Sequence, residues 1–404
     1  MNTSALPSTP PAGDASTRGR SILLAASIVT AVFVLSNSVT PLYTLWQQQF
    51  GFSSGTLTAI FAAYIGGLLV TLPVAGQLSD RLGRRPVLLP GLASALVACA
   101  LFATARSVAT LMIGRLLTGV AVGVVVSAGM AAVVDVGGAV LKRKASLAAS
   151  VAMVLGAGLG PLGAGVIAQW AHAPIPMTFA IEAGLIVLAG IVAMTLPLAP
   201  RPRPRATGGL RMPTIPASNR GHLVQGIAIF APGLTATSFV LALGPTLLSR
   251  LLGVSSPLVA GATACVMFLA ATGVQFMVRS VSVRTTFYLG GAATAGAMIG
   301  LLCVIYLGHP AWLAAAAILA GAGQGLGQLG GLTLISLHVQ ETRRAEAISL
   351  LNMGAYASAG LLPMLSGFAI DSVGLRGGAT LFAGVLLVSV LVAVWHIAHR
   401  AGRA

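Results

Sequence analysis

The chain has 404 residues, of which 56% are hydrophobic and 7% charged, with a mean hydropathy of +0.95 and a formal net charge of +16. So apolar a composition lies outside the range of soluble globular domains and indicates an integral membrane protein. The positive charge does not indicate a nucleic-acid-binding protein, because no basic face is combined with interleaved aromatic residues.

The first 20 residues are rich in Ser, Thr, Pro and Ala, so we expect a disordered cytoplasmic tail over 1–20. Apolar runs then recur at lengths close to the roughly 20 residues with which an α-helix crosses a bilayer. The predicted spans are 21–46, 55–78, 86–105, 108–134, 145–170, 175–198, 222–248, 255–278, 286–307, 312–336, 346–370 and 377–398. The predicted fold is therefore all-α, with twelve transmembrane helices.

Basic residues are divided unequally between the two sides of this arrangement. With a cytoplasmic N-terminus, 19 of the 23 Lys and Arg residues face the cytoplasm, and only Arg106, Arg250 and Arg376 face the other side. By the positive-inside rule both termini are cytoplasmic, including a short tail over 399–404. Short loops and an Ala-rich composition favour a bacterial inner membrane.

The loop between the second and third spans holds four charged residues within six positions: Asp80, Arg81, Arg84 and Arg85. Gly83 allows the short loop to turn sharply, and the arginines hold it in the cytoplasm and can pair with Asp80 or with helix ends. A purely topological role is the alternative, although it would need neither the acid nor the glycines.

Two charged residues lie well inside predicted spans, Arg115 in the fourth and Glu182 in the sixth. Each is about seven residues from the outer end of its span, which places both roughly 10 Å deep. Equal depth permits an ion pair that a proton could open. The alternative is that Glu182 reaches the outer interface and has no such role.

Small residues are concentrated in the fifth span. Gly156, Gly160 and Gly163 allow close approach of another helix, and Pro161 removes a backbone donor so that the helix can bend. Tight packing alone and a gating role, in which this helix moves against the other half of the molecule, both remain open.

A Pro-rich, basic stretch separates the first six spans from the last six. The predicted units are a six-helix half over 21–198, a cytoplasmic linker over 199–221 and a second half over 222–398. A shift of 202 positions brings Pro161 onto Pro363 and Gly165 onto Gly367, so the halves look duplicated. Two such halves, related about an axis along the membrane normal, form a transporter architecture with its substrate site between them.

Uncharged polar residues inside the spans are candidates for the substrate cavity: Asn37, Thr40, Gln275, Gln324, Gln328, Asn352 and Tyr356. The alternative for each is a simple cross-link between helices. Met and Phe residues accompany them, without an acidic or basic cage, which suits a largely apolar or amphipathic small molecule. No cofactor or metal is expected, because the three cysteines are far apart inside apolar spans.

Three segments resemble signature motifs of the major facilitator superfamily: GQLSDRLGRRPVL between helices two and three, LMIGRLLTGVAVG in helix four, and GAGLGPLGAG in helix five. The third resembles an antiporter motif, although Ala164 replaces its final glycine. The resemblance implies a fold of twelve helices in two pseudo-symmetric halves, as in drug or metabolite:proton antiporters. It also associates Arg115 with proton transfer, whereas many such antiporters carry an acid on helix one, where this chain has Asn37.

In this family the loop after helix two latches the outward-facing state, with its Asp opposed to a helix end and an Arg paired with an acid near the end of helix four. Asp135 occupies the position of that acid. The resemblance therefore implies a conformational latch with these members: Gly76, Asp80, Arg81, Gly83, Arg84, Arg85 and Asp135.

These features together predict a monomeric, proton-coupled efflux carrier for small amphipathic drug-like or metabolite compounds. Its partners would be the substrate, the proton and the lipid bilayer. The alternative is uptake of a small organic substrate by symport or facilitated diffusion. An enzyme is not expected, because the sequence offers no convergent nucleophile, base or metal set.

Overall fold

The computed structural model describes residues 12–198, 212–278 and 281–401, and within these ranges all regular elements are helices. They are α1 (Ala12–Phe50), α2 (Ser54–Leu82), α3 (Arg85–Ala103), α4 (Val108–Val124), the π-helix η1 (Val125–Gly129), α5 (Met130–Trp170), α6 (Pro174–Thr195), the 3₁₀-helix η2 (Ala217–Asn219), α7 (Arg220–Leu251), α8 (Pro257–Met277), α9 (Val283–Leu307), α10 (Pro310–His338) and α11 (Glu341–Ala401).

The predicted N-terminal tail is too long. Helix α1 begins at Ala12, so residues 12–20 are helical, and residues 1–11 lie outside the described part of the chain. Proline is disfavoured in a helix interior because it lacks a backbone N–H and its ring meets the preceding turn. Pro11 directly precedes α1, and the next proline inside the helix is Pro41. The helix therefore extends to the last position that the sequence leaves free of proline.

Two of the helices change direction at a glycine with positive φ. Gly138 interrupts α5 at a φ of 58°, and Gly374 interrupts α11 at a φ of 83°. Only glycine adopts such angles at little cost. The first turns of α5 continue α4 through η1, so the predicted fourth and fifth spans meet at Gly138. The eleventh and twelfth meet in the same way at Gly374.

Ten segments of the described residues are long and apolar enough to cross a membrane. One of them, Arg343–His396, covers both spans around Gly374. Helix α10 is not among the ten, because six glycines and two glutamines lower its hydropathy, yet it has the length of a span. The helix pattern is therefore consistent with the twelve predicted spans, and the all-α prediction is confirmed.

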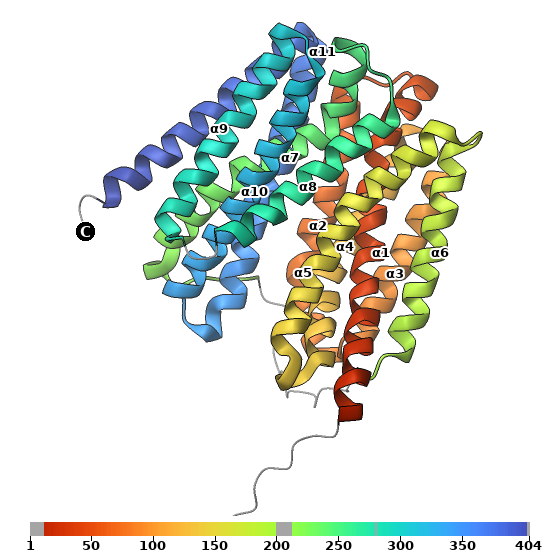
Figure 1. The fold of residues 1–404 in the computed structure, drawn as a ribbon, viewed down its shortest axis with the longest axis vertical. Helices are drawn as coiled ribbons and strands as arrows, with labels where there is room; N and C mark the ends of the chain where they lie inside the picture. Colours follow the sequence, from red (N-terminus) through yellow and green to blue (C-terminus); the bar gives the residue numbers. More distant parts are fainter. Residues whose placement is uncertain (1–11, 199–211, 279–280, 402–404) are drawn as a thin grey trace, which may run out of the picture.

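The helices form two bundles, α1–α6 and α7–α11 (Figure 1). The bundles meet where α2 packs against α11 and where α5 packs against α8. We call the end that carries Arg84, Arg85 and Arg343 the Arg-rich end, and the end where α2 and α8 begin the far end. In Figure 1 the bundles lie together at the far end, at the top, and diverge toward the Arg-rich end.

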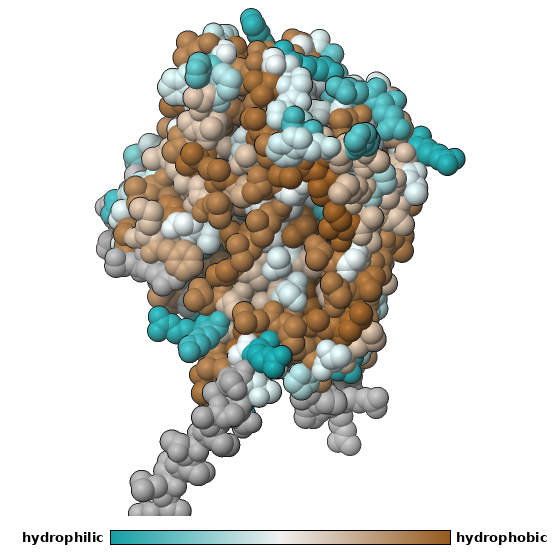
Figure 2. Space-filling model, turned by 45° about the vertical axis from the view of Figure 1, so that its right-hand side comes forward, coloured by the Kyte–Doolittle hydropathy of each residue, from teal (hydrophilic) through white to brown (hydrophobic). Residues whose placement is uncertain are grey.

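The face of the molecule drawn in Figure 2 is largely apolar across its middle, with hydrophilic residues mainly toward the two ends. Large hydrophobic side chains are exposed there on both bundles, among them Val70, Leu188, Leu269 and Val388. So much exposed apolar surface would be unfavourable in water, and it is the surface that lipid covers.

Candidate functional site

The loop at the Arg-rich end of α2 is held by its glycine. Helix α2 ends at Leu82, and Gly83 has a φ of +95° with its N–H donating to the Ser79 carbonyl. Helix α3 starts two residues later, with Pro86 in its first turn. A residue with a Cβ would be strained at this φ, so the sharp turn that aims Arg84 depends on glycine.

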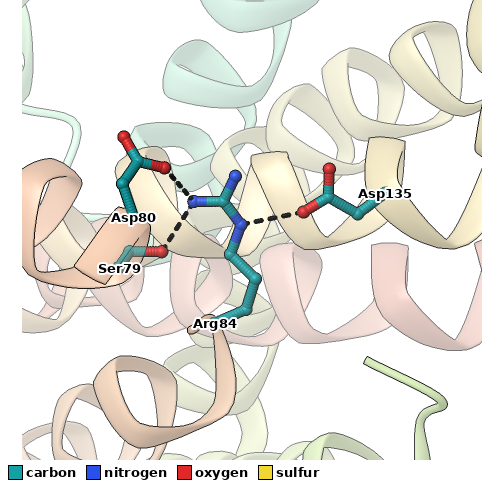
Figure 3. Close-up of polar contacts among 4 residues, drawn as sticks. All are labelled: Ser79, Asp80, Arg84 and Asp135. Atoms are coloured by element: carbon teal, nitrogen blue, oxygen red, sulfur yellow. Dashed lines mark hydrogen bonds and ion pairs between the residues drawn. The ribbon is translucent and has the colours of Figure 1, made fainter. Parts of the chain in front are cut away.

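Arg84 holds two acids and a hydroxyl together (Figure 3). Its Nε donates to Asp135 at 2.9 Å, and one terminal nitrogen donates to Asp80 at 3.0 Å and to the Ser79 hydroxyl at 2.7 Å. The Arg84 side chain is only 11% exposed, whereas the Asp80 side chain is 63% exposed. These contacts join α2 to α5 within the first bundle, and they bring together three of the residues predicted to form the latch.

Arg85 pairs with a helix end, one of the two kinds of partner that the sequence predicted for the arginines of this loop. Its guanidinium donates to the backbone carbonyls of Ala193 at 3.2 Å and Leu196 at 2.8 Å, which lie at the end of α6. A cation at a helix C-terminus satisfies unpaired carbonyls and the helix dipole. In this conformation Arg85 therefore fixes α6 to α3. Gly76, another predicted member of the latch, makes no close contact, because a Cβ added there would meet nothing within 4 Å.

Arg115 is 3% exposed and lies on the side of α4 that faces α1 and α2. It donates to the backbone carbonyl of Ser36 at 2.7 Å, and its guanidinium lies 4.6 Å from the ring centre of Tyr64 and 5.4 Å from that of Phe61. Its Nε has no hydrogen-bond partner. The aromatic faces hold the charge without neutralising it.

Glu182 is 4% exposed, so it does not reach the outer interface. Its carboxylate lies beside the Ser38 hydroxyl and near Cys99, and its Oε2 has no hydrogen-bond partner. The predicted ion pair with Arg115 is wrong for this conformation, because none forms between these two described residues. Ser38 and Ser36 are two positions apart on α1, about 200° around the helix, so α1 separates Glu182 from Arg115.

The glycines of the fifth span do not share one environment. A Cβ at Gly156 would lie 2.5 Å from the Thr30 carbonyl of α1, and Gly160 is equally close to the Val34 carbonyl of α1. Both pack within the first bundle, so their predicted role in gating between halves has no support in this conformation. Gly163 meets nothing. The Pro161 carbonyl instead touches Gly261 of α8, in the other bundle.

Besides Pro161, the contact between α5 and α8 involves residues outside the predicted set. A Cβ at Gly158 would lie 3.3 Å from Cys265, and one at Gly165 would lie 2.6 Å from the Pro257 carbonyl. Gly158 is two residues from Gly156, hence on the other side of the helix. The duplicated position of Gly165 was a signal that could have identified it.

The predicted cavity residues fall into two groups. Asn37 donates to the Phe33 carbonyl and the Ser36 hydroxyl of its own helix, and Gln275 donates to the Gly325 carbonyl. The Gln275 contact joins α8 to α10, which is the cross-linking alternative, whereas the Asn37 contacts stay within α1. The side chains with no hydrogen bond to another described residue are Thr40, Gln324, Gln328, Asn352 and Tyr356, and Oε1 of Gln324 is buried without a partner.

Tyr64 lies beside the contact between the bundles. The Arg115 guanidinium is 4.6 Å from the centre of its ring. The next residue on α2, Ile65, faces Gly360 of α11, where an added Cβ would lie 3.2 Å from the Ile65 side chain. No motif in the sequence pointed to Tyr64.

Two helical bundles with a lipid-facing belt and polar residues at their junction define a membrane transporter. A model of the Major Facilitator Superfamily matches residues 22–302 and 226–403. The chain belongs to this superfamily, as its three motifs indicated.

Relatives of known name match parts of the chain. Human major facilitator superfamily domain-containing protein 10 is 32% identical over 179 residues, which cover 40% of this chain and 38% of the relative. The bacillibactin exporter of Bacillus subtilis (strain 168) is 32% identical over 24% of this chain and 26% of its own. The multidrug resistance protein MdtL of Klebsiella pneumoniae is 33% identical over 19% of each chain. The chain thus spans less than two fifths of the length of each.

Solved structures match over nearly the whole chain. A peptide transporter, POT, is 17% identical with a TM-score of 0.75, covering 98% of this chain and 97% of its own. A bacterial homologue of the human lysosomal transporter Spinster is 13% identical with a TM-score of 0.72, covering 95% and 97%. At these identities the likeness establishes the fold alone.

Proposed function

We propose that this transporter exports small amphipathic compounds, drug-like molecules or metabolites, in exchange for protons by alternating access. The positive-inside rule would place the Arg-rich end in the cytoplasm, and the two bundles diverge toward that end in Figure 1. The proposed location is a bacterial inner membrane, with both termini in the cytoplasm and the monomer as the working unit.

The placement of Glu182 is the observation that carries the coupling proposal. The chain has seven acidic residues, and the other six lie at helix ends or outside the apolar spans: Asp14, Asp80, Asp135, Glu341, Glu346 and Asp371. A carboxyl inside a span is costly unless it is protonated, paired or hydrated. Glu182 has an unpartnered oxygen and no cation beside it among the described residues, so gain or loss of a proton would change its interactions strongly.

We propose that the effect of protonating Glu182 reaches the junction between the bundles through a small movement of α1. Ser38 faces Glu182, while the Ser36 carbonyl holds Arg115. We propose that Arg115 and Glu182 act together through α1 rather than through a direct ion pair. Protonation would then bias a two-state element that includes Arg115 and Tyr64, beside the contact between the bundles.

Export is favoured over uptake by two relatives whose names describe export or drug resistance, the bacillibactin exporter and MdtL. Uptake of a small organic substrate is the alternative. Cellular accumulation of a panel of fluorescent amphipathic dyes separates the two. Cells that produce the protein should hold less of a transported dye than cells with an empty vector, whereas higher accumulation would establish uptake.

The Arg84 cluster is proposed as the cytoplasmic latch of the cycle. Replacing Arg84 by alanine, or Asp80 by asparagine, should lower dye export roughly three- to tenfold with little change in the amount of protein in the membrane, because a charge-assisted contact is lost at a partly exposed site. Export at the wild-type rate by both variants would remove the cluster from the mechanism.

A further inference from the structure

The far end of α2 is capped by a residue of the other bundle. The N–H groups of Ser54 and Gly55 donate to the two carboxylate oxygens of Asp371 at 2.9 and 2.8 Å. Asp371 belongs to α11, 317 positions along the chain from Ser54. The next free N–H, that of Thr56, is satisfied locally by the Ser53 hydroxyl. The start of α2 therefore has its first unpaired donors satisfied only while the two bundles touch there.

The two helices are packed closely enough to make this contact specific. A Cβ at Gly55 would lie 2.6 Å from the Asp371 carboxylate, and a Cβ at Gly367 would collide with the Thr58 hydroxyl. That hydroxyl also lies 3.4 Å from the Met364 carbonyl of α11. Glycine at both positions lets the carboxylate sit directly on the positive end of the α2 dipole.

The second pair of helices that joins the bundles provides an internal comparison. At the offset of 202 positions, Asp371 corresponds to Gln169 and Gly55 corresponds to Pro257. Gln169 accepts one hydrogen bond, from the Ser256 hydroxyl at 2.9 Å. Proline has no N–H. In the second half the acid is therefore replaced by the amide of Gln169, and the N–H that corresponds to that of Gly55 is also missing. The charged cap is present in only one of two otherwise similar contacts.

We propose that Asp371 is a reversible clasp, which caps α2 across the bundles and stabilises the conformation that is closed at the far end. Each transport cycle must break and remake its two hydrogen bonds. Because the clasp is a charge on a helix end at an exposed position, its contribution falls as ionic strength rises. Gln169 makes the corresponding contact without this dependence.

Distances between spin labels test the clasp without any substrate. Labels on cysteines introduced at Arg106 and Ala311, in a chain with Cys99, Cys265 and Cys303 replaced by alanine, report the far-end separation of the bundles. Asp371→Asn should raise the population with the longer distance about three- to tenfold, as expected for losing one charge-assisted contact at an exposed site. Gln169→Ala is the matched control and should change it less than about twofold.

The response to ionic strength distinguishes an effect of the Asp371 charge from an effect of packing between α2 and α11. In the labelled protein that retains Asp371, raising ionic strength from about 0.01 to 0.5 M should increase the population with the longer distance. The Asp371→Asn protein should not respond. The proposal is overturned if Asp371→Asn gives the wild-type distance distribution, if Gln169→Ala has an equal effect, or if the salt response survives the loss of the charge.

Discussion

Replacing Glu182 by glutamine should abolish substrate accumulation driven by a pH gradient in inside-out membrane vesicles. The amide keeps the size and a hydrogen-bond acceptor beside Ser38, but it cannot exchange a proton at physiological pH. If Glu182 carries the coupling proton, the driven rate should fall to below about one tenth of the wild-type rate, since the other acids lie at or near helix ends and kinks and cannot replace it.

Two controls separate coupling from folding and binding. Exchange of labelled for unlabelled substrate in the absence of a gradient should continue in Glu182→Gln, because that exchange needs no net proton movement. Glu346→Gln removes an acid at the Arg-rich end that binds Thr214 and Arg343, and it should retain gradient-driven transport. Full gradient-driven transport by Glu182→Gln would exclude Glu182 as the carrier.

Arg115→Ala belongs to the same experiment. It removes the charge that Ser36, Tyr64 and Phe61 hold on the opposite side of α1. Loss of coupling in both variants is expected if α1 links the two residues. If Arg115→Ala also retains full coupling, proton coupling through these residues is excluded.

Valine at Gly165 should block the cycle at the contact between α5 and α8. The added Cβ would lie 2.6 Å from the Pro257 carbonyl, a backbone atom that cannot move aside as a flexible side chain would. The bundles could then not close at the far end. Transport should fall to below about one tenth of the wild-type rate, and the far-end spin-label distance should lengthen.

Gly163 provides a matched control on the same helix, because a Cβ there meets nothing within 4 Å. Gly163→Ala should transport normally and show the wild-type distance distribution. Normal transport by Gly165→Val would mean that close packing of α5 on α8 is not required at any step.

Local sequence pattern was sufficient for the loop at the Arg-rich end. The spacing of Asp80, Gly83 and Arg84 predicts a turn with charges on it, and resemblance to the family added Asp135, which contacts Arg84. These interactions are set by residues near in sequence and by one helix that packs beside them. The bounds of most helices followed equally from apolar length.

Rotation about the helix axes could not be predicted in this way. Hydropathy and length set how deep Arg115 and Glu182 lie, but α6 is apolar on all sides, and nothing in its pattern shows which face meets α1. For the same reason, the sequence did not show that Gly156 and Gly160 face α1 whereas Gly158 and Gly165 face α8. The Asp371 contact depends on how two distant helices dock, although the joint change of Gly55 to Pro257 and of Asp371 to Gln169 between the halves was visible in the sequence.

The direction of proton movement during transport is the most direct test of proton-coupled export. In inside-out vesicles with an acidic lumen and a pH-sensitive dye, adding a transported compound should raise the luminal pH as the compound enters, and Glu182→Gln vesicles should show no change. A lumen that becomes more acidic as the compound enters, or a compound that enters with no pH change in wild-type vesicles, would contradict exchange of substrate for protons.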